Sequence, residues 1–151
     1  YNTVDMSEMM FRERHLPSYK AAIEAGALSV MSSFNDFDGI PASGNKWLLT
    51  DLLRDELGFK GFVVSDYNSI SEMTRHRVVA DKKDAACLAL NAGLNMDMVD
   101  GSYYQFAEEL VKEGRVSEAQ IDKLCKDILT VKFKLGLFDD PFRYGGEGRW
   151  E

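Results

Sequence analysis

The sequence predicts an α/β fold, a partial parallel β/α barrel in which about three strands alternate with helices. Short, nearly continuous apolar runs each follow a helical stretch, and a polar, turn-rich segment follows each run. Strands that alternate with helices pair in parallel through crossover helices. A complete barrel takes about 250 residues. Because the chain has 151 residues, we expect a half-barrel, with an open doubly wound sheet as the alternative.

Composition limits the possible partners. A content of 45% hydrophobic and 11% aromatic residues is typical of a globular domain. The net charge of -7, with Lys and Arg scattered among acidic residues, argues against a nucleic-acid partner. No apolar run reaches the roughly 20 residues of a membrane helix, and residues 1–5 lack the pattern of a signal peptide. With no glycine-rich nucleotide motif either, we expect no nucleic acid, no membrane and no cofactor.

The first helical region covers residues 8–26. Ser7 can cap it, and an apolar stripe at three- and four-residue spacing continues to Gly26. Pro17 lies inside this stripe, where it removes a backbone donor and clashes with the preceding turn. We therefore expect a kink, or two separate helices.

Three later segments predict strands that are buried on both faces: residues 27–34, 61–65 and 94–98. A long polar loop, residues 35–41, follows the first strand. The helices between and after the strands are expected over residues 47–57, 85–92, 103–113 and 117–135. Ser117 and Gln120 can form a capping box for the last of these. We divide the chain into residues 1–136, the C-terminal half of a barrel domain, and residues 137–151, an exit linker toward a further domain.

Acidic residues follow all three strands, at the edge where parallel α/β folds bind ligands. We expect residues 34–38, 66–69 and 97–100 to line this edge together. Asp66 comes directly after Val63-Val64-Ser65, so a rigid strand can position its carboxylate as a nucleophile or base. The alternative is that Asp66 only caps the next helix. The remaining acids, Asp36, Asp38, Asp97 and Asp100, are individually ordinary turn residues, and their spacing supports no Mg²⁺ site.

The histidines and cysteines favour structural roles. His15 and His76 lie in polar, helical surroundings that we place far from the strand ends. Cys87 and Cys125 fall within helical patterns among apolar neighbours, which is typical of small core residues rather than of a disulfide or a metal site. The cellular compartment stays open, since a longer parent protein could be periplasmic or secreted.

Several linked motifs resemble one known family. They are Met31-Ser32-Ser33-Phe34-Asn35 with Asp38-Gly39-Ile40-Pro41-Ala42, then Leu53-Arg54-Asp55-Glu56-Leu57-Gly58-Phe59-Lys60-Gly61-Phe62-Val63-Val64-Ser65-Asp66, and Ala92-Gly93-Leu94-Asn95-Met96-Asp97-Met98. In this order they resemble glycoside hydrolase family 3, in its branch of bacterial β-glucosidases and β-xylosidases, over nearly the whole chain. The resemblance implies a TIM-like barrel and a retaining exo-acting β-glycosidase.

The resemblance assigns roles to five residues. It implies that Asp66 is the nucleophile that forms a glycosyl-enzyme intermediate, and that Met31, Phe34, Tyr67 and Met98 line the sugar pocket. The substrate would be an oligosaccharide or an aryl or alkyl β-glycoside. The family's sugar-clamping residues come from earlier strands and its acid/base from a following domain, so the resemblance implies negligible turnover by this chain alone.

Two departures and two alternatives accompany the resemblance. Relatives often carry Tyr where Phe34 stands and Asp where Asn95 stands. A β-N-acetylhexosaminidase of the same family is one alternative function, although the segment leading onward from Asp139 favours the multidomain branch. The other is a non-catalytic carbohydrate-binding or assembly module that self-associates through exposed half-barrel surfaces.

Overall fold

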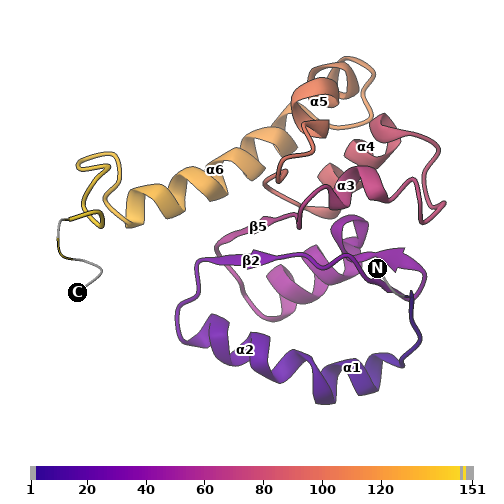
Figure 1. The fold of residues 1–151 in the computed structure, drawn as a ribbon, viewed down its shortest axis with the longest axis horizontal. Helices are drawn as coiled ribbons and strands as arrows, with labels where there is room; N and C mark the ends of the chain where they lie inside the picture. Colours follow the sequence, from indigo (N-terminus) through magenta and orange to yellow (C-terminus); the bar gives the residue numbers. More distant parts are fainter. Residues whose placement is uncertain (1–2, 147, 149–151) are drawn as a thin grey trace.

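The computed structural model describes residues 3–146 and residue 148 (Figure 1). The strands are β1 (Thr3–Val4), β2 (Ser29–Met31), β3 (Asp36–Phe37), β4 (Ile40–Pro41) and β5 (Phe62–Val64). The helices are α1 (Glu8–Arg14), α2 (Leu16–Glu24), η1 (Ala42–Gly44), η2 (Trp47–Glu56), α3 (Ser69–Glu72), α4 (Lys82–Ala92), α5 (Ser102–Lys112) and α6 (Glu118–Lys134). In the view of Figure 1, α1 and α2 lie on one side of the β2–β5 pair, and α3, α4 and α5 lie on the other.

The parallel strands of a partial β/α barrel form the centre of the fold. β2 pairs in parallel with β5, with Val30 opposite Val63 and Met31 opposite Val64. A parallel bridge between Val64 and Met96 adds the third segment on the other side of β5. The predicted α/β class with parallel pairing is therefore confirmed. The third strand, expected over residues 94–98, is reduced to this single bridge, because the chain turns away at once toward α5.

The two faces of this sheet differ in burial. Val63 and Ser65 are fully buried against the helices, whereas Phe62 and Val64 on the opposite face are only half-buried. On β2, Ser29 is exposed, and so is Met31 at 47%. The prediction that each strand is buried on both faces was wrong for β2, because no described residue covers this face of the strand.

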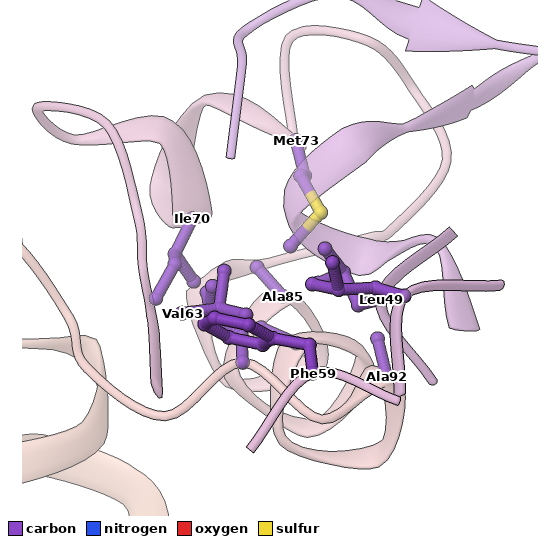
Figure 2. Close-up of a cluster of buried hydrophobic side chains, with 10 residues drawn as sticks. Leu49, Phe59, Val63, Ile70, Met73, Ala85 and Ala92 are labelled. Carbon is purple, nitrogen blue, oxygen red and sulfur yellow. The ribbon is translucent and has the colours of Figure 1, made fainter. Parts of the chain in front are cut away.

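The core lies on the helical face of the sheet. Figure 2 shows Phe59, Val63 and Ile70 grouped with Leu49 of η2 and Ala85 of α4. Gly61, just before β5, has no room for a side chain, because an added Cβ would clash with the Leu28 carbonyl oxygen. This close backbone approach lets β5 pair with β2 directly after the turn.

Local signals in the sequence fix several helix ends as predicted. The helical region over residues 8–26 is broken into α1 and α2, with Pro17 in the first turn of α2. The Ser7 hydroxyl accepts a hydrogen bond from the Met10 amide, and the Ser117 hydroxyl accepts one from the Gln120 amide. The second half of the expected capping box is absent, because the Gln120 side chain donates to the Leu90 carbonyl of α4 instead, at 2.6 Å.

The segment over residues 35–41 is more ordered than the predicted polar loop. β3 and β4 form a short antiparallel hairpin, and β1 adds to it in parallel. Asp36 stabilises this second sheet, because its Oδ1 accepts from the Val4 amide at 3.1 Å. The loop prediction was wrong here since the pairing partner, β1, lies more than thirty residues earlier in the chain.

Candidate functional site

The Asp66 side chain lies on the uncovered face of the sheet. Burial alternates along the chain here, with Val63 and Ser65 buried and Val64 and Asp66 half-buried. Side chains two residues apart in a strand lie on the same face. Asp66 therefore shares the face of Val64 and of its register partner Met31. It stands at the carboxyl end of β5, the position where barrels carry their reactive groups.

Asp66 does not cap the following helix with its side chain. Its Oδ1 accepts a hydrogen bond from the amide of its neighbour Tyr67 at 2.7 Å. The N-cap residue of α3 is Asn68, whose side chain makes no capping bond. The amide of Ser71 in the first turn of α3 donates instead to Oδ2 of Asp100 at 2.5 Å. The capping alternative for Asp66 is therefore wrong, and Asp100 does this work from the neighbouring loop.

The expected meeting of strand ends is observed for two of the three segments. The Ser65 amide donates to the Met96 carbonyl at 2.8 Å, and the Asn68 amide donates to the Met98 carbonyl at 3.3 Å. The Met98 amide in turn donates to the Ser65 hydroxyl at 2.8 Å. The turn that carries Asp66 is thus held against the segment 97–100.

The remaining acids have other surroundings. Asp36 holds β1, as described above, and Asp97 Oδ2 accepts from the Tyr103 amide at the start of α5 at 3.2 Å. Asp38 is exposed at the β3–β4 turn with a left-handed φ of 54°. Of the acids that follow the strands, Asp36, Asp97 and Asp100 hold structural hydrogen bonds and Asp38 lies in the β3–β4 turn, whereas Asp66 lies at the end of β5 on the open face.

Asp97 is half-buried, with surroundings that disfavour its charge. Its Oδ1 is buried without a hydrogen-bond partner. Desolvation by burial raises the pKa of this carboxyl above its ordinary value, and the nearby charge of Asp100 adds to the rise, against the lowering effect of the Tyr103 amide. Burial likewise raises the pKa of the Tyr103 phenol, whose hydroxyl donates to the Leu94 carbonyl at 2.9 Å.

The four residues expected to line a sugar pocket differ in exposure. Met31 and Tyr67 are exposed, at 47% and 56%. Phe34 and Met98 are half-buried. Met98 lies beside the Asp66 turn through the backbone bonds given above, and Met31 lies on the same sheet face as Asp66. Their role in binding sugar stays a prediction.

A buried chain of serine hydroxyls beneath the strand ends was not predicted. Ser32 Oγ lies 2.8 Å from Ser43 Oγ, which lies 2.6 Å from Ser69 Oγ, and all three residues are buried. The chain joins the end of β2, the helix η1 and the first residue of α3. Ser32 stands in the first motif and Ser43 directly follows its second part, but nothing in the spacing of three single serines indicates that they meet.

A second buried network explains the departure at Asn95. The Asn95 Oδ1 accepts from the Val63 amide and from the Arg54 guanidinium, and its Nδ2 donates to the Leu124 carbonyl and to Asp127 Oδ2, both at 3.1 Å. Arg54 also pairs with Asp127 at 3.3 Å, and burial lowers the pKa of its guanidinium. Asn95 therefore joins the sheet to α6 and lies away from the open face.

The histidines and cysteines are placed partly as predicted. His15 lies at the α1–α2 junction, stacked on Phe11. His76 was expected far from the strand ends in a helix, but it lies in the turns after α3 with its Nδ1 3.9 Å from Asp36 Oδ2. Cys87 is buried in α4, whereas Cys125 is exposed on α6, so the core prediction was wrong for Cys125. Its position falls on the solvent face of the α6 periodicity.

Within residues 3–146 and 148, no group of three or more His, Cys, Asp or Glu side chains could hold a metal ion. None of the helices described is long and apolar enough to cross a membrane.

A cavity of about 380 Å³ lies apart from Asp66. It is a partly open pocket between α1 and α2 on one side and η2 and β2 on the other, and its lining is mostly apolar, including Phe11, Tyr19, Val30 and Leu52. Met31 is the one predicted pocket residue that reaches it. Neither α1 nor α2 contributes a fully buried residue, and Ile23 of α2 packs against the core as a partly buried side chain.

The fold has parallel strands with crossover helices, and a carboxylate lies at a strand end on the open face. These features define the class of the protein, which is part of a β/α-barrel domain of enzyme type. Residues 1–131 match the family described as "Glycosyl hydrolase family 3 N terminal domain". The chain belongs to glycoside hydrolase family 3.

Named relatives agree with this assignment. The chain is 44% identical to a periplasmic β-glucosidase of Salmonella typhimurium over 97% of its own length and 19% of the relative's. It is 44% identical to a β-xylosidase of Formosa agariphila, over 89% of this chain and 20% of that one. The crystal structure of a β-glucosidase from Listeria innocua in complex with glucose superposes with a TM-score of 0.92 at 42% identity, over 95% of this chain and 20% of that one. The chain thus spans about a fifth of the length of these relatives.

Proposed function

We propose that this chain carries the nucleophile of a retaining, exo-acting β-glycosidase of the β-glucosidase or β-xylosidase type, and that the nucleophile is Asp66. The observation that carries the proposal is the position of the Asp66 carboxylate. It lies at the carboxyl end of β5 on the open face of the sheet, while the helix that follows is capped by Asp100. A carboxylate that is not engaged in capping is available for chemistry.

In the proposed reaction an Asp66 oxygen attacks the anomeric carbon of a terminal β-linked sugar. The bond from that carbon to the leaving-group oxygen breaks, and this oxygen takes the electron pair and a proton. Water then attacks the same carbon from the opposite face while the acid/base takes a proton from it, and the bond from the carbon to the Asp66 oxygen breaks. This returns the Asp66 carboxylate and releases the sugar with its configuration retained. The Tyr67 amide, which donates to Oδ1, orients the carboxylate for this attack.

The substrate class follows from the relatives and from the predicted pocket. The relatives given above are named β-glucosidases and a β-xylosidase, and a mutant of the Listeria innocua β-glucosidase is described in complex with laminaribiose. Met31, Phe34, Tyr67 and Met98 would supply apolar and aromatic surface for the face of a pyranose. An oligosaccharide or an aryl or alkyl β-glycoside fits these surroundings.

Protonation of the leaving group needs a second carboxyl about 5–5.5 Å from the nucleophile. Among the other acids that follow the strands, Asp36, Asp97 and Asp100 accept structural hydrogen bonds, and Asp38 lies in the β3–β4 turn. We therefore assign the acid/base to a part of the longer enzyme outside residues 1–151, and the segment 137–151 to the linker that leads there.

A second property follows from the uncovered sheet face. Met31 and Tyr67 are exposed, and β2 pairs with β5 on one edge only among the described strands. An open edge and apolar side chains on one surface favour association between chains. We propose that the chain by itself forms oligomers through this surface.

An activated 2-deoxy-2-fluoro glycoside tests the assignment of Asp66 directly. Its 2,4-dinitrophenolate leaving group departs without protonation, so a nucleophile alone can form the adduct. We expect intact-mass and peptide mapping to place a covalent fluoroglycosyl group on Asp66, and the Asp66→Asn variant to stay unlabelled. A gluco and a xylo reagent are compared in parallel, and a 2-acetamido reagent measures the hexosaminidase alternative.

Asp38→Asn is the matched control. Asp38 also follows a strand of the motif region, and its left-handed φ is one that Asn adopts readily. This variant should label like the unchanged chain. The proposal is contradicted if the unchanged chain stays unlabelled, if the adduct lies on any other residue, or if Asp66→Asn is labelled equally. Sugar binding that is unaffected by Asp66→Asn would favour a non-catalytic binding module.

A further inference from the structure

The turn that carries Asp66 leads directly into α3, and the Ser69 amide of α3 donates to the Asp66 carbonyl at 3.1 Å. Only Tyr67 and Asn68 separate Asp66 from α3, and α3 is four residues long. Asn68 adopts a left-handed conformation with φ 59°, which Asn adopts more readily than most residues that carry a side chain. The position of the Asp66 backbone therefore depends on what holds α3.

Asp100 holds α3 from the loop after the third strand. Its side chain is 1% exposed. Oδ2 accepts from the Ser71 amide at 2.5 Å, and Oδ1 lies 3.4 Å from Lys82 Nζ at the start of α4. A carboxylate at a helix N-terminus satisfies an amide that has no partner within the helix and interacts favourably with the helix dipole. Asp100 thus replaces the capping bond that Asn68 does not make.

The same loop is bonded to the Asp66 turn on both sides of Asp66. Before it, the Ser65 hydroxyl accepts from the Met98 amide, and after it, the Asn68 amide donates to the Met98 carbonyl. Asp100 adds the third attachment, at Ser71, and it is the one that uses a buried charged side chain. Asp100 therefore joins the loop 97–100 to α3 at a point beyond the two bonds that hold the Asp66 turn itself.

We propose that Asp100 is a positioning residue for Asp66: it fixes the turn that aims the Asp66 carboxylate, without itself touching the sugar. The inference rests on the proposed function of Asp66. A displacement of about 1 Å can cost about 100-fold in the rate of a reaction that depends on alignment, while the affinity for a ligand held by other groups changes little.

The test uses the kinetics of labelling by the 2-fluoro glycoside, with the maximal rate kinact separated from the half-saturating concentration KI. Asp100→Ala removes the bond to Ser71, and we expect kinact to fall about ten-fold or more with KI unchanged within about two-fold. Asp100→Asn keeps an oxygen that can accept from the Ser71 amide but loses the charge. Its kinact should therefore lie between that of Asp100→Ala and that of the unchanged chain.

Ser117→Ala is the control for general destabilisation. It removes the capping bond at the start of α6, which is part of a different segment, and kinact should be unchanged. Two results would overturn the inference. One is an equal kinact in Asp100→Ala and in the unchanged chain. The other is a loss of kinact that has the same size in Asp100→Ala, Asp100→Asn and Ser117→Ala. If the unchanged chain is not labelled at Asp66, the proposed function fails first, so the two failures are distinguishable.

Discussion

The carboxylates of Asp66 and Asp97 lie on opposite faces of the same parallel sheet. Asp66 lies on the half-buried face with Val64, and its Oδ1 accepts from its own neighbour Tyr67. Asp97 turns to the helical side, where Oδ2 accepts from the Tyr103 amide and Oδ1 has no partner. Two acids at equivalent strand ends therefore differ in chemistry: one is available to a ligand and the other stabilises α5.

Asp97→Asn should change how stability depends on pH. The folded-state pKa of Asp97 is raised by burial above the value of an unfolded Asp, so its contribution is fully present below the unfolded pKa and is lost as pH rises through the folded pKa. Asn does not titrate. We expect the free energy of unfolding of Asp97→Asn, minus that of the unchanged chain, to increase between about pH 3.5 and about pH 7, a range that starts near the ordinary Asp pKa. Urea titrations at the two pH values measure this, and a constant difference would contradict it.

Ser43→Ala should destabilise the fold by about 1–3 kcal/mol, because it leaves the buried hydroxyls of Ser32 and Ser69 without their shared partner. Urea unfolding measures the change. Ser18→Ala serves as the control, since Ser18 is exposed and bonds only the nearby His15 carbonyl; it should change stability by less than about 0.5 kcal/mol. Similar values for the two variants would show that the serine chain contributes little.

Asn95→Asp should destabilise the chain by about 2 kcal/mol, since the Leu124 carbonyl loses its donor and a carboxylate then faces Asp127. Asp127→Asn should relieve that repulsion, so the double variant should be more stable than the sum of the two single changes predicts. A double-mutant cycle by chemical unfolding gives the coupling. Additive effects would mean that Asn95 and Asp127 do not interact.

Hydrolysis by the chain alone should depend on the leaving group. With no acid/base assigned within residues 1–151, we expect no measurable release of sugar from an alkyl β-glucoside, whose leaving group needs protonation. The dinitrophenyl reagent should still label Asp66. Chromatography of the reaction mixture checks the first result, and turnover of the alkyl glycoside that Asp66→Asn abolishes would show that the acid is present in this chain.

Oligomers formed through the open sheet face should dissociate when that face is made charged. Met31→Lys places a charge beside the free edge of β2, so the sedimentation coefficient should fall toward that of a monomer. Tyr104→Lys is the matched control, because Tyr104 is 95% exposed on α5. A monomeric unchanged chain, or equal effects of both variants, would contradict association through this face.

The sequence predicts those features that depend on neighbouring residues. The caps at Ser7 and Ser117 and the break at Pro17 are predictable because each acts within one turn of its own position. The parallel strand order and the location of Asp66 at a strand end also follow from the apolar runs. The residues around Asp66 are therefore enough to place it at a strand end, whereas its role as nucleophile is a prediction that came from the family resemblance.

Contacts between distant segments could not be predicted in the same way. The β1–β3 pairing, the serine chain and the approach of His76 to Asp36 each join residues that lie more than ten positions apart. Common residue types at such separations carry no periodic signal. The face that Asp97 adopts is a further example, since its position after a strand is equivalent to that of Asp66 and only the partner at Tyr103 distinguishes them.

Asn95 and Gln120 together set the direction of α6. Gln120 ties its first turn to α4, and Asn95 ties its second and third turns to β5 through Leu124 and Asp127. Roughly 10 Å of helix extends past Asp127 to Lys134. Val131 within this length is buried, so the last turns of α6 stay packed on the fold. The direction in which the chain leaves α6 is therefore set by the same contacts that fasten the helix to β5 and α4.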